Sequence, residues 1–499
     1  MNLAQKFAKE SIISLLGVVF GNINRYLFTV IIARWTGIQV LGLYSLANSI
    51  IMIVESVAKL GLERGVLRYV SMLDLATEKS KIREITASAL KMTGIASLLL
   101  SLLLILFSGW LVFSLLNEEE ALHSILLMFA LILPLNALTN VGVFATQGLK
   151  LLKYKVVVTQ IINPMVLVIG GALLLFFWSD IKVVIIPVTI AAITSIIVLA
   201  FFLKKLLDFK AWNVITASWD KSLLAYSVPL MFIGILQTVM HWMDILMLGY
   251  FTDAAQVGLY HPAVRTAGLM QAVILSMMSI YAPLAAQLFG KNDMEGLSNL
   301  FKLTARWSIT LTLPIAVIFL VIPNKIMLVF GAEYVSSSMV LMILAGATFI
   351  QVIGSAATPI ITITGHTKLS LLNSIIALVM NVVLNIFLIP LYGIIGAGLA
   401  TFISITLIGL LRNIEVYYLF KMNLFSKPLY KPFLAGLILF LILNLMKPLI
   451  MPFHTIITGS IVVISGFTIY GLILYALKLE PEDADYVSGI IILKDLVKK

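Results

Sequence analysis

The sequence predicts an all-helical integral membrane protein with about fourteen spans. Of its 499 residues, 61% are hydrophobic and only 11% are charged, and the mean hydropathy is +1.09. Soluble globular chains carry about 25% charged residues, so this composition excludes that class. A bilayer core about 30 Å thick requires about 20 apolar residues per helix, and stretches of that length recur along the whole chain.

The spans are runs of apolar residues separated by charged or turn-forming connections. We predict them at 11–33, 40–62, 86–114, 122–147, 156–178, 183–203, 223–251, 257–287, 303–323, 337–363, 369–390, 394–420, 431–450 and 455–477. Lys6 and Lys9 precede the first run, which is too long for a signal-peptide core and has no small-residue cleavage pattern after it. We therefore expect the first run to remain as a membrane helix.

Lysine and arginine gather in the connections on one side of the predicted membrane. With the N-terminus on that side, it collects Lys6, Lys9, Arg64, Arg68, Lys79, Lys81, Arg83, Lys150, Lys153, Lys155, Lys204, Lys205, Lys210, Lys221, Lys291, Lys427, Lys431 and the Lys-rich tail. The other side holds Arg34, Lys182, Lys325, Lys447 and the acidic run Glu118–Glu120. Because cytoplasmic loops carry the excess of basic residues, we expect both termini in the cytoplasm and the protein in the cell membrane.

The same rule accounts for the net charge of +11 without a nucleic-acid partner. The chain has no cysteine, which excludes disulfides, thiolate metal sites and cysteine nucleophiles. We expect no cofactor and no metal.

An internal repeat is the strongest sign of domain organisation. Gln39-Val40 and Gly42-Leu43-Tyr44 recur as Gln256-Val257 and Gly258-Leu259-Tyr260, and the stretch Gln147–Lys150 is echoed by Thr364–Lys368. A repeat of six spans begins and ends on the same side of the membrane, so the two copies are parallel. We predict an N-terminal lobe at 1–215 with spans 1–6, a C-terminal lobe at 216–422 with spans 7–12, and a third part at 423–499 with spans 13–14 and a short cytoplasmic tail.

Asn22, Asn24 and Arg25 lie near the middle of the first predicted span. A mid-membrane arginine costs at least about 2.5–3.5 kcal/mol, so such a residue faces the protein interior or a water-filled cavity. Two interpretations follow: Arg25 is a structural partner of a neighbouring helix, or it lines a transport path.

Other charged residues lie within the second, seventh and eighth spans. The repeat sets His241 opposite Arg25, and Asp244 shares a helical face with His241. Arg265 has no acidic residue at helical spacing. Asp244 with His241 is a candidate for coupling a proton or a sodium ion.

Lys59 follows Glu55 by four residues, the favourable order for an intrahelical ion pair, and this pairing is the structural interpretation of both residues. Glu55 is also a second candidate for ion coupling. We predict that Arg25, Asn24, Lys59, His241 and Arg265 contact the substrate. If these residues face one cavity, Lys59, Arg25 and Arg265 form a series of cations from the cytoplasmic to the outer side. Such a series suits a phosphate or pyrophosphate group, because guanidinium forks match phosphate geometry.

Four stretches, together with the layout of six, six and two spans, carry a family resemblance. They are A-R-W-T-G-I-Q-V-L-G-L-Y at 33–44, L-G-L-E-R-G-V-L-R-Y at 60–69, L-V-F-G-A-E-Y at 328–334 and I-P-L-Y-G-I-I-G-A-G-L-A-T at 389–401. The chain resembles the polysaccharide-transporter (oligosaccharide flippase, Wzx-like) branch of the MOP superfamily, related to MATE exporters and the lipid II flippase.

The resemblance implies a V-shaped pair of six-helix lobes around a central cavity, with a lipid-tail groove at the last two helices, 431–477. It implies movement of a polyprenyl-(pyro)phosphate-linked oligosaccharide to the outer leaflet by alternating access. The lipid II relatives line their cavity with cations of the first, second and eighth helices. Arg25 and Arg265 match these in type and place, and Lys59 matches in sign only. The expected partners are this lipid-linked substrate, membrane lipids, H+ or Na+, and polysaccharide-assembly proteins.

Two other function classes compete with a flippase. A MATE-like exporter coupled to protons or sodium would place acidic residues in its cavity, and only Asp244 and Glu55 are good candidates. A membrane-embedded glycan polymerase would need a large catalytic loop or a clustered acidic or histidine site, whereas the predicted outer loops are short. No G-x-x-x-x-G-K-[ST] motif occurs, so we do not expect ATP hydrolysis. We predict a transporter rather than an enzyme.

Overall fold

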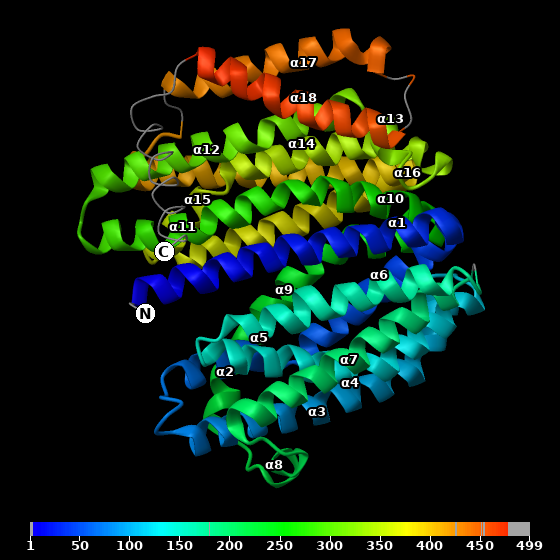
Figure 1. Ribbon diagram of the computed structural model, residues 1–499, viewed down its shortest axis with the longest axis vertical. Coiled ribbons are helices and arrows are strands. Elements are labelled where there is room, and N and C mark those ends of the chain that lie inside the picture. The colour runs from blue at the N-terminus through cyan, green and yellow to red at the C-terminus, as the bar shows by residue number, and fades with distance from the viewer. Residues whose placement is uncertain (1–2, 179, 425–426, 451, 453–454, 478–499) are drawn as a thin grey trace. The chain divides into compact units, whose positions relative to one another are not determined.

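The computed structural model describes residues 3–178, 180–424, 427–450, 452 and 455–477, and within them it contains helices and connecting turns but no strand (Figure 1). The all-helical fold predicted from composition is therefore confirmed. The Lys-rich tail, predicted as a cytoplasmic appendage, lies at 478–499, outside the described residues.

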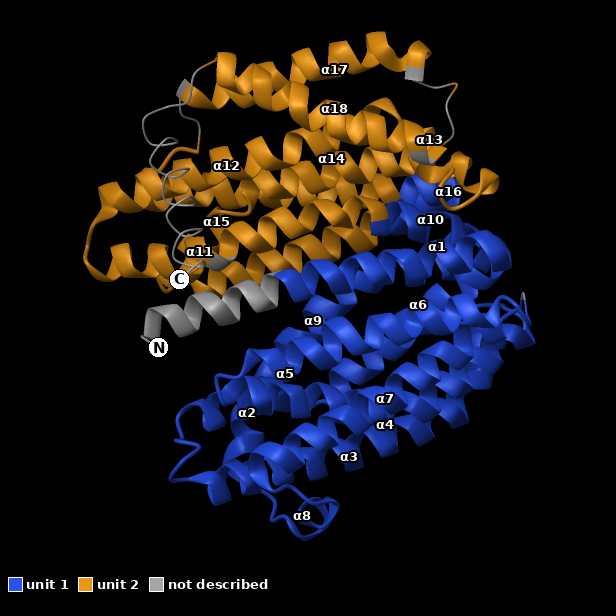
Figure 2. Ribbon diagram, viewed as in Figure 1, with its two compact units in different colours: residues 1–265, 385–397 blue, residues 266–384, 398–499 orange. Residues whose placement is uncertain are grey.

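The chain divides into two compact units (Figure 2). Unit 1 comprises residues 1–265 and 385–397. Its elements are α1 (Leu3–Ala58), α2 (Leu62–Ser71), α3 (Lys79–Gly109), α4 (Glu120–Gly148), α5 (Leu152–Val156), α6 (Asn163–Leu174), α7 (Lys182–Leu207), α8 (Ala211–Thr216), α9 (Lys221–Phe251), most of α10 (Ala254–Ala267), and the π-helical turns η1 (Trp110–Leu115) and η2 (Val157–Ile162).

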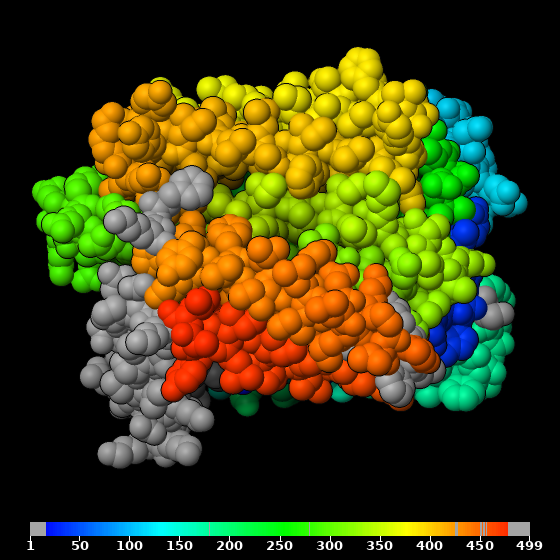
Figure 3. All heavy atoms as spheres, turned by 90° about the horizontal axis from the view of Figure 1, so that it is seen from above, coloured from blue at the N-terminus to red at the C-terminus, as the bar shows by residue number. Residues whose placement is uncertain are grey.

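Unit 2 comprises residues 266–384 and 398–499. Its elements are α11 (Gln271–Gly290), α12 (Met294–Val321), α13 (Pro323–Met327), α14 (Ser338–Gly354), α15 (Ala357–Ile363), α17 (Tyr430–Ile450), α18 (Thr455–Ala476), and the 3₁₀ turns η3 (Gly268–Met270), η4 (Ala332–Ser337) and η5 (Lys427–Leu429). The long helix α16 (Thr367–Phe420) begins and ends in unit 2, while its middle belongs to unit 1. Figure 3 shows α17 and α18 side by side on one face of unit 2.

Twelve helices among the described residues are long and apolar enough to cross a membrane. Two of them, at 16–58 and 367–420, hold 43 and 54 residues. At about 1.5 Å per residue, the length summed along each helix is at least about 65 Å, twice the thickness of a bilayer core. Each also contains one non-helical residue, Gly37 (φ 81°, ψ −179°) and Gly393 (φ 54°, ψ −129°). Two crossings in each of these helices would give the fourteen predicted spans, and that number stays a prediction.

Glycine is the residue that tolerates these backbone angles at low cost. Gly37 belongs to the T-G-I-Q stretch and Gly393 to the L-Y-G-I stretch, which separate the first two and the eleventh and twelfth predicted spans. The breaks therefore lie where the sequence predicts connections.

The repeat-related glycines of the two G-L-Y stretches approach one another inside unit 1. A Cβ on Gly42 would meet the carbonyl of Ala254 and the backbone nitrogen of Gly258, and a Cβ on Gly258 would meet the carbonyl of Ile38 and the backbone nitrogen of Gly42. The contact is reciprocal, as expected when equivalent positions of two copies meet at a local twofold axis. The two compact units are defined by contacts within the structure, whereas the two lobes are defined by the sequence repeat. The predicted lobe boundaries therefore remain a prediction.

Candidate functional site

Arg25 is held by neighbours on η2 and on its own helix. Its Nη2 donates to the Thr159 carbonyl at 2.7 Å, and its Nη1 donates to Gln160 Oε1 at 3.0 Å and to Asn22 Oδ1 at 3.3 Å. A Cβ on Gly21 of α1 would collide with Gln160, so the missing side chain lets η2 approach close enough for these bonds. The π-helical turn supplies the contacts, in keeping with the frequent occurrence of such turns at functional sites.

Asn24 does not share this environment. Its Nδ2 donates to the Phe20 carbonyl at 2.9 Å, one turn back on α1. The amide is therefore engaged with its own helix, and its predicted contact with substrate remains untested.

Arg265 pairs with a histidine on its own helix. Its Nε donates to His261 Nε2 at 3.1 Å, one helical turn earlier on α10. A nitrogen that accepts carries no proton, so His261 is neutral with its proton on Nδ1. Only 1% of His261 is exposed, and its Nδ1 has no hydrogen-bond partner among the described residues. The partner of Arg265 at helical spacing is therefore a neutral side chain rather than an acidic one.

Five residues form what we call the arginine cluster: Arg25, Tyr44, His241, His261 and Arg265. The charge of Arg265 acts on Arg25, Tyr44, His241 and His261, so each of these four side chains lies within electrostatic range of Arg265. In the part of the chain that the structure describes, neither arginine has a carboxylate within ion-pair distance. The cluster therefore retains positive charge that its own hydrogen bonds do not neutralise.

Asp244 lies on α9, one turn from His241, and is bonded by neutral donors. Asn385 Nδ2 donates to its Oδ1 at 2.8 Å, and the Tyr260 hydroxyl donates to its Oδ2 at 3.3 Å. The repeat sets the neighbouring His241 opposite Arg25, but the described hydrogen bonds of Arg25 do not include Asp244. The role of Asp244 in ion coupling remains untested.

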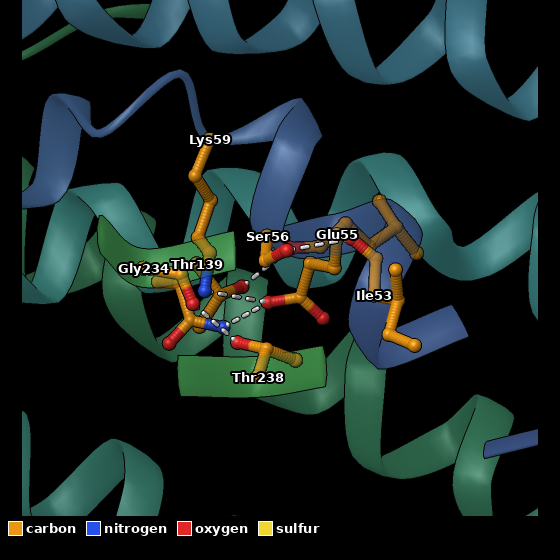
Figure 4. Close-up of polar contacts among 9 residues, drawn as sticks. Ile53, Glu55, Ser56, Lys59, Thr139, Gly234 and Thr238 are labelled. Carbon is orange, nitrogen blue, oxygen red and sulfur yellow. Dashed lines mark hydrogen bonds and ion pairs between the residues drawn. The ribbon is translucent and has the colours of Figure 1, made fainter. Parts of the chain in front are cut away.

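Lys59 and Glu55 belong to a second group of contacts (Figure 4). Lys59 Nζ lies 3.7 Å from Glu55 Oε1, which confirms the predicted intrahelical ion pair. Asn140 Nδ2 of α4 also donates to this oxygen, at 2.5 Å. Figure 4 shows Thr238 of α9 beside the pair. Glu55 is only 2% exposed, so the carboxylate depends on Lys59 and Asn140 in place of water.

The structure thus places Arg25 and His241 within electrostatic range of Arg265 and gives Lys59 partners of its own. The residues missed from the sequence are Gln160, Tyr44 and His261. The pair of residues at 261 and 265, four apart on one helix, was the one signal that could have been found.

Comparison with known proteins decides the family. The family model described as "Polysaccharide biosynthesis protein" matches residues 7–289, more than half of the chain, and the MatE model matches residues 229–387. The chain belongs to the polysaccharide biosynthesis protein family. This match confirms the resemblance to the polysaccharide-transporter family that the sequence motifs predict.

Two curated relatives of this family member come from Haloferax volcanii. The probable low-salt glycan biosynthesis flippase Agl15 is 30% identical over 164 residues, 33% of this chain and 35% of that protein. The probable flippase AglR is 23% identical over 244 residues, 48% of this chain and 50% of that protein. The chain thus spans about a third and a half of the length of these two relatives.

Solved structures resemble this family member over most of its length. Lipid II flippase MurJ in an inward closed conformation gives a TM-score of 0.73 at 16% identity, covering 94% of this chain and 98% of that one. An inward-facing multidrug resistance MATE family transporter gives 0.66 at 15% identity, covering 83% of this chain and 98% of that one. At these identities the similarity establishes the fold, which is that of MOP superfamily transporters.

Proposed function

We propose that the protein is a flippase that moves a lipid-linked glycan across the cell membrane. The observation that carries the proposal is the arginine cluster: Arg25 and Arg265 come from different helices, lie within range of each other's charge, and have only neutral partners among the described residues. Two unneutralised guanidinium groups within a membrane are costly. An anionic ligand that lies between them would offset this cost.

The chemistry of the cluster favours a phosphate. A guanidinium presents several N–H donors in one plane, and each arginine still has donors beyond those used in its described bonds. Phosphate oxygens accept two parallel bonds from such a fork. The proposed substrate is therefore an oligosaccharide on a polyprenyl phosphate or pyrophosphate carrier, moved from the cytoplasmic to the outer leaflet by alternating access.

The names of the relatives support this proposal. Agl15 and AglR are named as probable flippases, the former in glycan biosynthesis, and MurJ is named as a lipid II flippase. These activities involve no covalent chemistry, in agreement with the prediction of a transporter rather than an enzyme. Cytoplasmic termini and contacts with polysaccharide-assembly proteins are further parts of the proposal.

A MATE-like exporter coupled to protons or sodium is the second candidate. Residues 229–387 match the MatE model, and this segment contains Asp244, whose two carboxylate oxygens each accept a hydrogen bond from a neutral donor. The two candidate sites for ion coupling are Asp244 with His241, and Glu55. Both sites are compatible with a flippase and with a MATE-like exporter. Coupling unchanged in Asp244→Asn would remove the first of these sites.

The test is flipping of a fluorescent polyprenyl-pyrophosphate sugar in proteoliposomes. We expect Arg25→Ala and Arg265→Ala each to slow flipping at least tenfold, which corresponds to losing one charged hydrogen bond. Arg34→Ala is the matched control, since Arg34 is an exposed arginine of α1 outside the cluster. Wild-type rates in both cluster variants would refute the role of the arginines. Export of an organic cation, with no flipping of any lipid-linked sugar, would favour the MATE-like candidate.

A further inference from the structure

The connection between α7 and α9, residues 208–220, is folded against unit 1. We call it the interface loop; it contains α8, which projects outward beyond α3 in Figure 1. Phe209 and Ala217 point inward and join the hydrophobic core of the unit. On α3, Lys91 Nζ donates to the carbonyls of Ile215 at 3.0 Å and Ala217 at 2.8 Å. These contacts fix which side of the loop faces outward.

The outward side carries three large apolar residues. Trp212 is 66% exposed, Ile215 is 63% exposed and Trp219 is 53% exposed. Trp212 and Ile215 are three residues apart on α8 and so share a face. In water, exposed aromatic and aliphatic side chains on one short element are unfavourable. This surface is therefore suited to a partner that is itself partly apolar.

The loop lies where the lipid-facing surface of unit 1 ends. On α7, exposed apolar side chains follow one face in steps of three or four residues, at Ile190, Ile193, Ile197 and Phe201, and the exposed Lys204 and Lys205 come next. On α3, the exposed stripe begins at Ile95, one turn after Lys91, the residue that holds the loop. Both helices thus change from apolar to basic at the level of the loop, as expected at the boundary between acyl chains and headgroups.

Basic residues surround the apolar side of the loop. Lys204, Lys205, Lys210 and Lys221 are all exposed, and all lie within or directly beside the loop. Tryptophan prefers the headgroup level of a bilayer, and lysine clusters next to spans attract anionic lipids. A soluble protein partner would match the tryptophans alone; an anionic bilayer surface matches both the tryptophans and the lysines.

We infer that the interface loop is a membrane anchor, with Trp212, Ile215 and Trp219 inserted at the headgroup boundary and the four lysines bound to the phosphates of anionic lipids. The inserted side chains lie about 5–10 Å into the boundary between headgroups and acyl chains, the depth typical of interfacial helices. The anchor fixes the segment that joins the sixth and seventh predicted spans to the membrane surface. This inference does not depend on the transported substrate.

The test uses the full chain in liposomes, and the absence of native cysteine makes single labels simple to place. An environment-sensitive fluorophore is attached to Ile215→Cys, with Ala76→Cys as the matched control in the exposed connection between α2 and α3. Quenching is measured with lipids that carry a nitroxide near the headgroup and with iodide in water. We expect the label at position 215 to be quenched by the lipid at least about threefold more than the control, and by iodide correspondingly less.

The lipid preference is read from energy transfer to fluorescent phosphatidylglycerol, compared with fluorescent phosphatidylcholine. We expect enrichment of phosphatidylglycerol around the label, and loss of that enrichment when Lys204, Lys205, Lys210 and Lys221 are all replaced by Gln. Iodide quenching equal to that of the control would overturn the inference. Shielding from both quenchers that disappears on dilution would assign the surface to a second copy, and equal transfer from both lipids would remove the anionic preference.

Discussion

Replacing Lys59 by methionine removes the cation of the buried pair while preserving most of the side-chain volume. The side chain of Glu55 is 3% exposed and that of Lys59 is 21% exposed. Without Lys59, the carboxylate keeps only the Asn140 bond and cannot reach water. In Glu55→Gln, by contrast, Lys59 loses its partner but extends toward solvent, and the glutamine oxygen still accepts from Asn140.

The expected costs follow from this difference in exposure. An uncompensated buried charge costs about 3–5 kcal/mol in a folded protein, and an ionised residue in a membrane helix costs about 2.5–3.5 kcal/mol. We therefore expect Lys59→Met to lower the free energy of unfolding by about 3 kcal/mol. Glu55→Gln should cost about 1 kcal/mol, because the remaining cation is partly hydrated. The double variant should be close to Glu55→Gln, since it leaves no unpaired charge.

Unfolding by sodium dodecyl sulfate in mixed micelles, followed by far-ultraviolet circular dichroism, measures these differences. Lys81→Met is the control, because it removes an exposed pair with Glu78 at 4.0 Å that should contribute at most about 1 kcal/mol. A Lys59→Met variant no less stable than Glu55→Gln, or a double variant whose loss equals the sum of the single losses, would refute the reasoning.

Three further predictions concern the backbone break, the arginine cluster and the interface loop. Gly37→Ala should cost about 1–3 kcal/mol in the same unfolding assay, because its backbone angles are open almost only to glycine; an unchanged stability would contradict the assigned conformation. Gln160→Leu removes a charged hydrogen bond from Arg25 and should raise the substrate concentration for half-maximal flipping about tenfold. An unchanged concentration would show that Gln160 does not contribute to substrate binding. The Lys79 ammonium donates to Asp208 at 2.7 Å and lowers the pKa of that carboxyl, so the stabilising contact is complete above about pH 4 and is lost as the pH falls through the lowered pKa. The label on Ile215→Cys should keep a constant emission spectrum from pH 7 to about pH 5 and change only in stronger acid, and a change near neutral pH would exclude this contact as the cause.

The membrane fold was predictable because its signal is carried by long runs of residues of one kind. Apolar length, basic asymmetry and the breaks between runs are local properties, and the helices observed follow them. The breaks at Gly37 and Gly393 lie in predicted connections for the same reason, since a left-handed backbone favours glycine wherever it occurs.

The repeat also had consequences that the structure displays. Gly42 and Gly258 were matched by sequence alone, and their backbones meet in unit 1. Matching residues in the two sequence repeats indicate equivalent positions. Whether two equivalent positions touch depends on how far each lies from the local twofold axis that relates the repeats. That distance is not encoded in the motif.

The site was only partly predictable. Arg25, His241 and Arg265 were visible in sequence because any ionisable side chain within an apolar run is conspicuous. Their partners were not: Gln160 and Tyr44 are polar residues without charge, and they become important only because helices far apart in sequence pack together.

Sequence by itself determined that this chain is a multi-span membrane protein, that its two halves share a motif, and that particular arginines must face something other than lipid. The conclusions about the membrane spans and the arginines depend on the free energy of transferring each residue from water to hydrocarbon. This free energy can be assigned to a residue without knowing which side chains surround it. Tertiary structure alone decided that Arg25 is bonded to η2 and that Asn140 of α4 donates to the buried Glu55 carboxylate. Hydrogen bonds form over about 3 Å between atoms whose positions are set by the packing of the whole unit, so no local pattern could specify them.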